Sequence, residues 1–163
     1  MTDIAFRRPS ETDYASIVRV VDDWWGGERH MDVLLPRLWL QHFTGTSWIA
    51  EDEVGALVGF LVGFVSPDRP TEGYVHMVAS HPGRRTLGIG RDLYEHFFDD
   101  MRGRGVTTVK AITWPGNRRS VAFHRAIGFT VVDGPGTQNL YGTPSFAVYD
   151  FEREDRVVLV RLL

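Results

Sequence analysis

The chain has 163 residues, the length of one ordinary domain, with 43% hydrophobic and 24% charged residues. This composition excludes a disordered or fibrous protein. The formal net charge of −3 argues against a general nucleic-acid binder, so we expect no nucleic-acid partner. Because the sequence has no cysteine, it excludes a disulfide framework, a thiolate zinc site and a cysteine nucleophile. We expect a single domain over residues 1–163.

No part of the sequence resembles an export or membrane signal. A charge arrives at Asp3 with no apolar region after it, unlike a secretory signal peptide. The longest apolar stretch, residues 54–65, is shorter than the roughly 20 residues that a membrane helix needs. The sequence therefore predicts a cytoplasmic protein with no membrane partner.

Hydrophobic periodicity and turn residues predict the elements in chain order. The first half is expected to hold a strand at Ile4–Arg8, a helix from about Glu11 to Trp25 capped by Ser10 and Asp13, a helix from about Met31 to Phe43, and strands at Ser47–Glu51, Val54–Val65 and Gly73–Ser80. The second half is expected to hold a helix from about Gly88 to Arg102, a strand at Val106–Thr113, a helix from Asn117 to Ile127, a strand at Phe129–Val132, a loop at 133–145, and strands at Phe146–Tyr149 and Arg156–Leu162.

This order predicts an α+β fold: a mixed, mostly antiparallel, twisted sheet of about seven strands with about four helices. The strands between residues 47 and 80 should form an antiparallel meander, and the strand–helix–strand unit from 73 to 113 should be parallel. Within the strand at 54–65, Gly55, Gly59 and Gly63 share one face, where we expect a neighbouring element to pack closely.

The segment from His81 to Arg91 lies between an expected strand and an expected helix. Gly88 and Gly90 allow the backbone to approach a ligand, and the first amides of the helix form an anion site. Arg84, Arg85 and Arg91 add positive charge in the same place. The segment therefore favours pyrophosphate binding, against the simpler interpretation of a helix start with solvated arginines.

Other nucleotide and metal sites lack the residues they need. A dinucleotide fingerprint beginning at Gly88 would require a third glycine where the chain has Leu93. A P-loop needs a Gly-Lys-Ser/Thr triplet, and the only lysine is Lys110, inside an expected strand. The six histidines show no metal-ligand spacing, so we expect no metal.

Two motifs resemble the GNAT superfamily of acetyl-CoA-dependent N-acyltransferases. Residues 85–90, Arg-Thr-Leu-Gly-Ile-Gly, match the family's Arg/Gln-x-x-Gly-x-Gly/Ala signature. The family's second motif is matched at Asn117, Ser120, Phe123, His124, Gly128 and Phe129. The resemblance covers nearly all of residues 4–162 and implies the GNAT fold.

The resemblance also implies acetyl-CoA as co-substrate and a set of residues that bind it. The backbone of Val78 and Ala79 would pair with the pantetheine arm, and a backbone N–H there would polarise the thioester carbonyl. The strands at 73–80 and 106–113 would be splayed apart to admit the thioester. Residues implied for the pyrophosphate are Arg84, Arg85, Thr86, Leu87, Gly88, Ile89, Gly90 and Arg91, and those implied for the far side of the arm are Asn117, Ser120 and Phe123. The family often dimerises, which makes a homodimer an expectation.

His124 departs from the family, which usually has tyrosine there as the acid for the departing thiolate. An imidazolium is still a stronger acid than a thiol. Three interpretations stay open: His124 is the acid, it only shapes the pocket, or activity has been lost.

A base is also needed, because an ammonium must lose a proton before it attacks. His76, mid-strand among apolar residues, is the first candidate, although a lone buried histidine is often structural. Glu72 is the second candidate, and an ordered water is an alternative to both.

The acceptor amine is expected near the first two helices. Asp22, Asp23, Trp24 and Trp25 combine two acids with two aromatic rings, a chemistry that holds a cation. In the competing interpretation the acids are solvated and the tryptophans close the core.

Three hypotheses for function follow. The first is acetyl transfer from acetyl-CoA to a primary amine of a small molecule or peptide, by direct attack in a ternary complex. The second is a non-catalytic acyl-CoA sensor of the same fold. The third is an interaction protein that neither binds acyl-CoA nor catalyses acetyl transfer.

Overall fold

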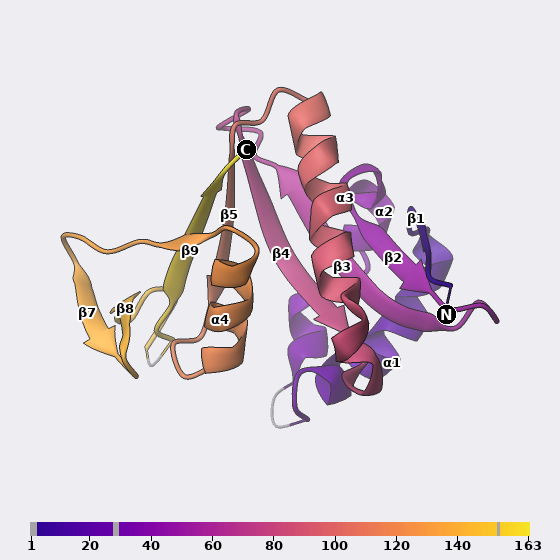
Figure 1. Ribbon diagram of the computed structural model, residues 1–163, viewed down its shortest axis with the longest axis horizontal. Coiled ribbons are helices and arrows are strands. Elements are labelled where there is room, and N and C mark those ends of the chain that lie inside the picture. Colours follow the sequence, from indigo (N-terminus) through magenta and orange to yellow (C-terminus); the bar gives the residue numbers. More distant parts are fainter. Residues whose placement is uncertain (1–2, 28–29, 153) are drawn as a thin grey trace.

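A seven-stranded sheet runs through the computed structural model, which describes residues 3–27, 30–152 and 154–163 (Figure 1). The strands in spatial order are β1 (Ala5–Arg7), β2 (Trp48–Glu51), β3 (Leu57–Val65), β4 (Glu72–Ser80), β5 (Thr108–Thr113), β9 (Val157–Leu162) and β6 (Thr130–Val131). All neighbours are antiparallel except β4 and β5, which are parallel. The predicted α+β class, the antiparallel meander and the parallel unit are confirmed.

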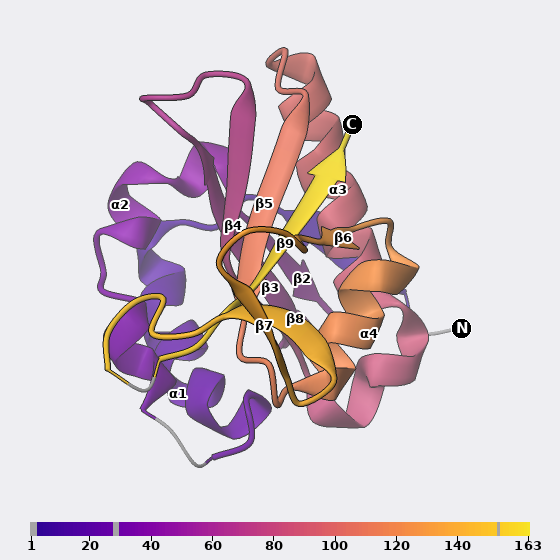
Figure 2. The same cartoon turned by 90° about the vertical axis from the view of Figure 1, so that its left-hand side faces the viewer.

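The helices lie on both faces of this sheet (Figure 2). One face carries α1 (Tyr14–Trp24) and α2 (Trp39–His42), and the other carries α3 (Ile89–Gly103) and α4 (Arg118–Ala126). Short 3-10 helices lie at Glu11–Asp13, Met31–Leu34, Thr44–Thr46 and Pro82–Leu87. Within the described residues, none of the helices combines the length and apolar character that crossing a membrane requires.

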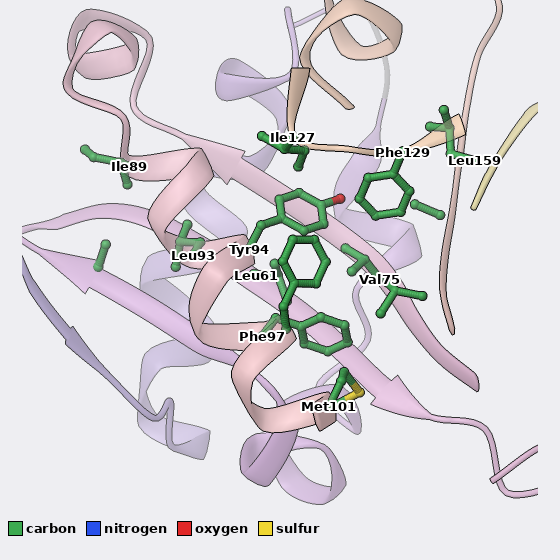
Figure 3. Packing of buried hydrophobic residues seen from close by; sticks show 14 of the residues in the cluster. Leu61, Val75, Ile89, Leu93, Tyr94, Phe97, Met101, Ile127, Phe129 and Leu159 are labelled. Atoms are coloured by element: carbon green, nitrogen blue, oxygen red, sulfur yellow. The ribbon is translucent and has the colours of Figure 1, made fainter. Parts of the chain in front are cut away.

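The core under α3 depends on glycines in β3. Tyr94 and Phe97 of α3 are fully buried against the sheet, as Figure 3 shows. A Cβ atom on Gly63 would lie 2.6 Å from the Phe97 ring, and one on Gly59 would lie 2.7 Å from Ile89. The close packing predicted for this glycine face is therefore confirmed, and it brings α3 down onto the sheet.

The predicted helix from Met31 to Phe43 is wrong as a single element. The chain forms a 3-10 turn at Met31–Leu34, leaves helical geometry at Leu35 with φ −124° and ψ 63°, and forms only the short α2 afterwards. Pro36 explains the break, because proline disfavours the helical region for the residue before it.

The predicted loop at 133–145 and strand at Phe146–Tyr149 are also wrong. Residues 137–146 form a hairpin of β7 (Thr137–Leu140) and β8 (Thr143–Phe146), which lies in front of the sheet in Figure 2. Its two-residue turn has positive φ at both Tyr141 (53°) and Gly142 (82°), the geometry of a hairpin turn that follows strand twist. Because the segment is rich in glycine and proline, its composition indicates a loop and does not reveal the hairpin.

Candidate active site

The sheet opens between β4 and β5. The two strands pair only at Glu72–Thr108, Gly73–Val109 and Tyr74–Lys110, whereas β4 continues to Ser80. Figure 1 shows the strands diverging beyond this point. We call this opening, bounded by β4 after Tyr74 and by β5 after Lys110, the fork. The fork is the splayed arrangement that the family resemblance implied.

A β-bulge at His76 marks the start of the fork. The β3–β4 register shifts between Val62, which pairs with Met77, and Gly63, which pairs with Val75, so His76 is the extra residue. His76 and Met77 consequently point to the same face, where His76 contacts Trp39 and Met77 joins the core under α1. A bulge bends its strand and redirects a side chain. Here it accompanies the divergence of β4 from β5.

The backbone of Val78 faces the fork. The His81 N–H donates to the Val58 carbonyl at 2.9 Å, and the same register pairs Leu61 with Val78. Because antiparallel pairs alternate between hydrogen-bonded and non-hydrogen-bonded, the Val78 N–H and C=O point away from β3. By the same alternation, the backbone groups of Ala79 point towards β3. Of the two residues implied to pair with a ligand arm, the register favours Val78.

The chain enters α3 through the glycine turn for which the sequence predicts anion binding. The 3-10 helix at Pro82–Leu87 ends at Gly88, whose φ of 79° suits glycine, and α3 begins at Ile89. The first amides of α3 have no partner within the helix and lie at the positive end of its dipole. Thr86 and Leu87 are exposed beside them. Gly90 serves packing, because a Cβ there would lie 3.3 Å from the Phe123 ring.

The arginines around this turn have different partners. Arg84 pairs with Asp52 at 2.8 Å, and Arg85 donates to the Trp24 carbonyl at 2.6 Å. Partial burial lowers the pKa of Arg85, and the nearby positive charge of Arg119 lowers it further. Among the described residues, no carboxylate forms an ion pair with Arg85, Arg119 or the exposed Arg91. Neighbouring cations without a counter-charge favour a bound anion.

Asn117 and Ser120 form the start of α4. The Asn117 side chain accepts a hydrogen bond from the Ser120 N–H at 3.0 Å and thereby caps the helix. Phe123, one turn later, packs against Gly90 and against Tyr94, with ring centroids 5.9 Å apart in the second case. These three residues join α4 to the beginning of α3.

His124 lies inside the aromatic core between α3 and α4. Its side chain is 5% exposed, its Nε2 lies 2.7 Å from the Tyr94 hydroxyl, and its Nδ1 lies 2.7 Å from the Ser120 carbonyl. One neutral tautomer satisfies both contacts: Nδ1–H donates to Ser120, and Nε2 accepts from Tyr94. Burial lowers the pKa of His124 and raises that of Tyr94, so each stays neutral. This geometry supports the interpretation in which His124 shapes the pocket.

We expect His124 to make the stability depend on pH. The pKa of His124 is lower in the folded protein than the about 6.5 of an unfolded histidine, so the unfolded chain binds more protons in acid. The contribution of His124 to the free energy of unfolding should therefore be fully present above about pH 6.5. This contribution should fall as the pH drops towards the pKa of His124 in the folded protein. His124→Gln keeps an acceptor for Tyr94 but does not titrate, so its melting temperature should fall less between pH 7.5 and 5. Equal pH dependence in both proteins would contradict this assignment.

One ring nitrogen of His76 is hydrogen-bonded to the backbone of Leu34. Its Nε2 lies 2.6 Å from the Leu34 carbonyl, which requires a proton on Nε2, and its ring stacks on Trp39 with centroids 4.1 Å apart. Desolvation lowers the pKa of His76, and the bond to Leu34 opposes that effect. The ring is therefore neutral near pH 7, with the lone pair on Nδ1.

Glu72 lies at the closed end of the fork. Its carboxylate is 2.7 Å from the Lys110 amine and 3.6 Å from Arg69. Tyr74, the last paired residue of β4, has its pKa raised to about 12, chiefly by burial. Two cations lie against the Glu72 carboxylate and balance its negative charge.

The acidic and aromatic residues at the end of α1 are placed separately. Asp22 accepts the backbone N–H groups of Met31 and Asp32 at 2.7 and 3.0 Å, while Asp23 is exposed. Trp24 is only 6% exposed and packs on Phe60, so it belongs to the core. Trp25 is 42% exposed, and its indole N–H donates to the Val78 carbonyl at 3.1 Å. Of the four residues, Trp25 alone contacts the fork.

Sequence reasoning missed three features of the site. Tyr94 lies within the helix predicted from Gly88 to Arg102, but nothing in its spacing from His124 indicates a hydrogen bond between them. The stack of Trp39 on His76 depends on the break at Pro36. Asp22, His30 and Asp32 place ligand atoms within 4.8 Å of one another, a cluster that spacing did not suggest. Because Asp22 there caps two backbone amides, the cluster is explained by chain geometry.

Comparisons with known proteins show which family this chain belongs to. The sequence model of the Acetyltransferase (GNAT) family matches residues 14–129. An L-2,4-diaminobutyric acid acetyltransferase of Nocardia farcinica is 32% identical over 74% of this chain and 62% of its own length. The enzyme of the same name from Streptomyces coelicolor is 30% identical over 72% of this chain and 69% of its own. The chain thus spans less than two thirds of the first of these relatives.

A solved structure resembles the whole chain. Diaminobutyrate acetyltransferase from Paenibacillus lautus, solved with L-2,4-diaminobutyric acid and coenzyme A, superposes with a TM-score of 0.69. The two are 25% identical, and the match covers 98% of this chain and 95% of the other. With the family match over more than two thirds of its residues, the forked sheet and the glycine turn before α3, this chain belongs to the GNAT acetyltransferase family.

Proposed function

We propose that the protein transfers an acetyl group from acetyl-CoA to a primary amine of a small molecule. The fork carries this proposal: an unpaired stretch of β4 leads directly to the glycine turn and first amides of α3. An extended amide-containing arm fits the strand edge, and phosphates fit the helix start. The family membership supports the same function.

The residues present fit the phosphates and the arm of acetyl-CoA. Arg85 and Arg119, two cations without a carboxylate partner among the described residues, would hold phosphate oxygens together with the amides of α3. The Val78 N–H, directed into the fork, would donate to the arm or to the thioester carbonyl. When bound, acetyl-CoA supplies an activated acetyl group. Arg84, already paired with Asp52, would support the turn without contacting the ligand.

The acceptor that we propose is a small amino acid with a second amine, such as L-2,4-diaminobutyric acid. The printed names of the relatives from Nocardia farcinica and Streptomyces coelicolor support this choice. The exposed carboxylate of Asp23, at the end of α1, forms no ion pair among the described residues and would supply negative charge for an ammonium group.

His76 is the base in this proposal. Its Nε2–H is fixed on the Leu34 carbonyl, so Nδ1 can take the proton that the acceptor ammonium loses before attack. The lowered pKa keeps His76 neutral, and therefore able to accept a proton, at pH 7. His124 would hold α4 in place through Tyr94, and the thiolate would take its proton from water.

We expect His76→Gln to slow acetylation without weakening the binding of acetyl-CoA. Glutamine keeps an N–H donor for Leu34 but has no basic nitrogen, and general base catalysis contributes about 10²–10⁴-fold. The predicted result is a fall of that order in kcat, with an unchanged Kd for acetyl-CoA by calorimetry. An unchanged kcat would mean that His76 is not the base and that an ordered water or Glu72 takes the proton.

The function itself is tested by thiol release from acetyl-CoA over a panel of amines. Because the chain has no cysteine, a thiol reagent has no background from the protein. We expect turnover with L-2,4-diaminobutyric acid, and less or none with amines lacking the carboxylate or the second amine. Acetyl-CoA binding without turnover on any amine would favour the sensor hypothesis, and no binding would refute both.

Two sequence predictions remain proposals about the whole protein. A cytoplasmic location can be tested by fractionating cells that express the protein. A homodimer can be tested by light scattering of the protein after gel filtration, against a chain mass of 18.5 kDa.

A further inference from the structure

The C-terminal end of α1 makes two hydrogen bonds with the proposed acetyl-CoA site. The Trp25 indole N–H donates to the Val78 carbonyl at 3.1 Å. The Arg85 guanidinium donates to the Trp24 carbonyl at 2.6 Å. Residues 24 and 25 therefore contact both the strand edge and one of the arginines proposed to hold the phosphates.

The Val78 carbonyl is a group that a ligand arm on β4 would also use. The register directs it into the fork, away from β3. An arm that adds to β4 as an extra strand would place its own amide N–H against this oxygen. The Trp25 indole stands in that position, so the indole and the arm compete for one acceptor.

The Trp25 side chain can move without disturbing the core. Its side chain is 42% exposed, whereas the neighbouring Trp24 is 6% exposed and stacks on Phe60. Trp25 follows the last residue of α1, and Gly26 and Gly27 follow it with φ of 105° and 74°, values that favour glycine. The indole can leave Val78 by rotation at the helix end while Trp24 stays packed.

We infer that Trp25 covers the open edge of β4 in the unliganded protein and is displaced from Val78 by the pantetheine arm of coenzyme A. The inference rests on the proposed function, because it requires that coenzyme A binds in the fork. Covering the edge also serves the unliganded protein, since unpaired strand edges promote association with other chains. Trp25 thereby competes with the donor for the Val78 carbonyl and is not one of the contacts that hold the donor in place.

The indole N–H signals of the tryptophans test this directly. The five tryptophans give five signals in a ¹⁵N–¹H spectrum, and Trp25→Phe, or Trp25→Leu if the first is unstable, identifies the signal of Trp25. Saturating coenzyme A should shift that signal more than the other four, because the N–H loses its carbonyl acceptor. The fragment 3′,5′-ADP, which lacks the arm, should produce only a minor part of the shift. An unmoved Trp25 signal, or a full shift with 3′,5′-ADP, would overturn the inference.

Affinity supplies the second readout. Phenylalanine keeps a ring but has no N–H, so Trp25→Phe should bind coenzyme A about threefold to tenfold more tightly, as expected for removal of one competing hydrogen bond. The matched control is Trp48→Phe, which also removes an indole N–H hydrogen bond, to Asp100 at 2.8 Å, but lies in β2 away from the fork, and it should show no such gain. If wild-type protein binds coenzyme A but Trp25→Phe binds no more tightly, the inference fails alone. If wild-type protein does not bind coenzyme A, the proposed function fails first.

Discussion

Replacing Arg85 with glutamate is expected to weaken acetyl-CoA binding by about 100-fold to 1,000-fold, since a charged hydrogen bond is lost and a repulsion is added. The introduced carboxylate would also pair with the nearby Arg119, so that Arg119 would no longer be free to bind the phosphates of acetyl-CoA. The same change removes the hydrogen bond to the Trp24 carbonyl and relieves a repulsion between two arginines, since Arg119 lowers the pKa of Arg85, so its two effects on the stability of the unliganded protein oppose each other. Calorimetry should therefore show lost affinity while the melting temperature without ligand is maintained.

The matched control is Arg102→Glu. It makes the same change in net charge at the other end of α3, where Arg102 pairs with the exposed Asp99 at 3.0 Å. Surface pairs of this kind contribute little, so its Kd for acetyl-CoA should stay within about twofold of wild type. Equal losses of affinity in the two variants would show that net charge, and not the site at Arg85, governs binding.

Adding one methyl group at Gly63 is expected to destabilise the fold by about 1–3 kcal/mol, the range for overpacking a core. The new Cβ would lie 2.6 Å from the Phe97 ring and 2.9 Å from the Tyr74 carbonyl oxygen, and neither can withdraw easily. Phe97 is fully buried, and the carbonyl belongs to β4 just before the bulge. For a domain of this size, the melting temperature should fall by roughly 3–10 °C.

Two further variants separate a local clash from a general effect of alanine. Gly103→Ala, at the end of α3, meets no atom within 4 Å and should leave stability unchanged or raise it. Adding Phe97→Leu to Gly63→Ala should cost less than the two single changes together, because the smaller side chain gives way to the methyl group. Strict additivity would mean that Gly63 and Phe97 are not in steric conflict.

The sequence predicted the parts of the site that are continuous along the chain. The turn at Gly88 and the start of α3 are encoded by successive residues, so their helix-start chemistry can be recognised without a structure. The glycines of β3 likewise predict close packing, because strand alternation alone places them on one face. Residues 24 and 25 show the limit of this reasoning. One tryptophan enters the core and the next contacts β4, a difference that composition does not contain.

Contacts between distant segments could not be predicted in the same way. The hydrogen bond between Tyr94 and His124 joins two helices whose relative rotation is set by packing, including Phe123 on Gly90. The bulge at His76 depends on how β3 and β4 align, since both strands are apolar on both faces and alternation does not fix the register there. The break before α2 had a local signal in Pro36, whose effect on the preceding residue outweighed the helical spacing.

The fork has a thermodynamic consequence. Three residue pairs join β4 to β5, so the two halves of the sheet share few backbone hydrogen bonds. A ligand arm that bonds to β4 inside the fork would act as a strand that the polypeptide itself does not provide. Its binding energy would then also be folding energy, and at 100 times its Kd such a ligand adds about 2.7 kcal/mol to the stability. The cellular concentration of acetyl-CoA would thus help to set how long the protein survives, as well as how fast it works.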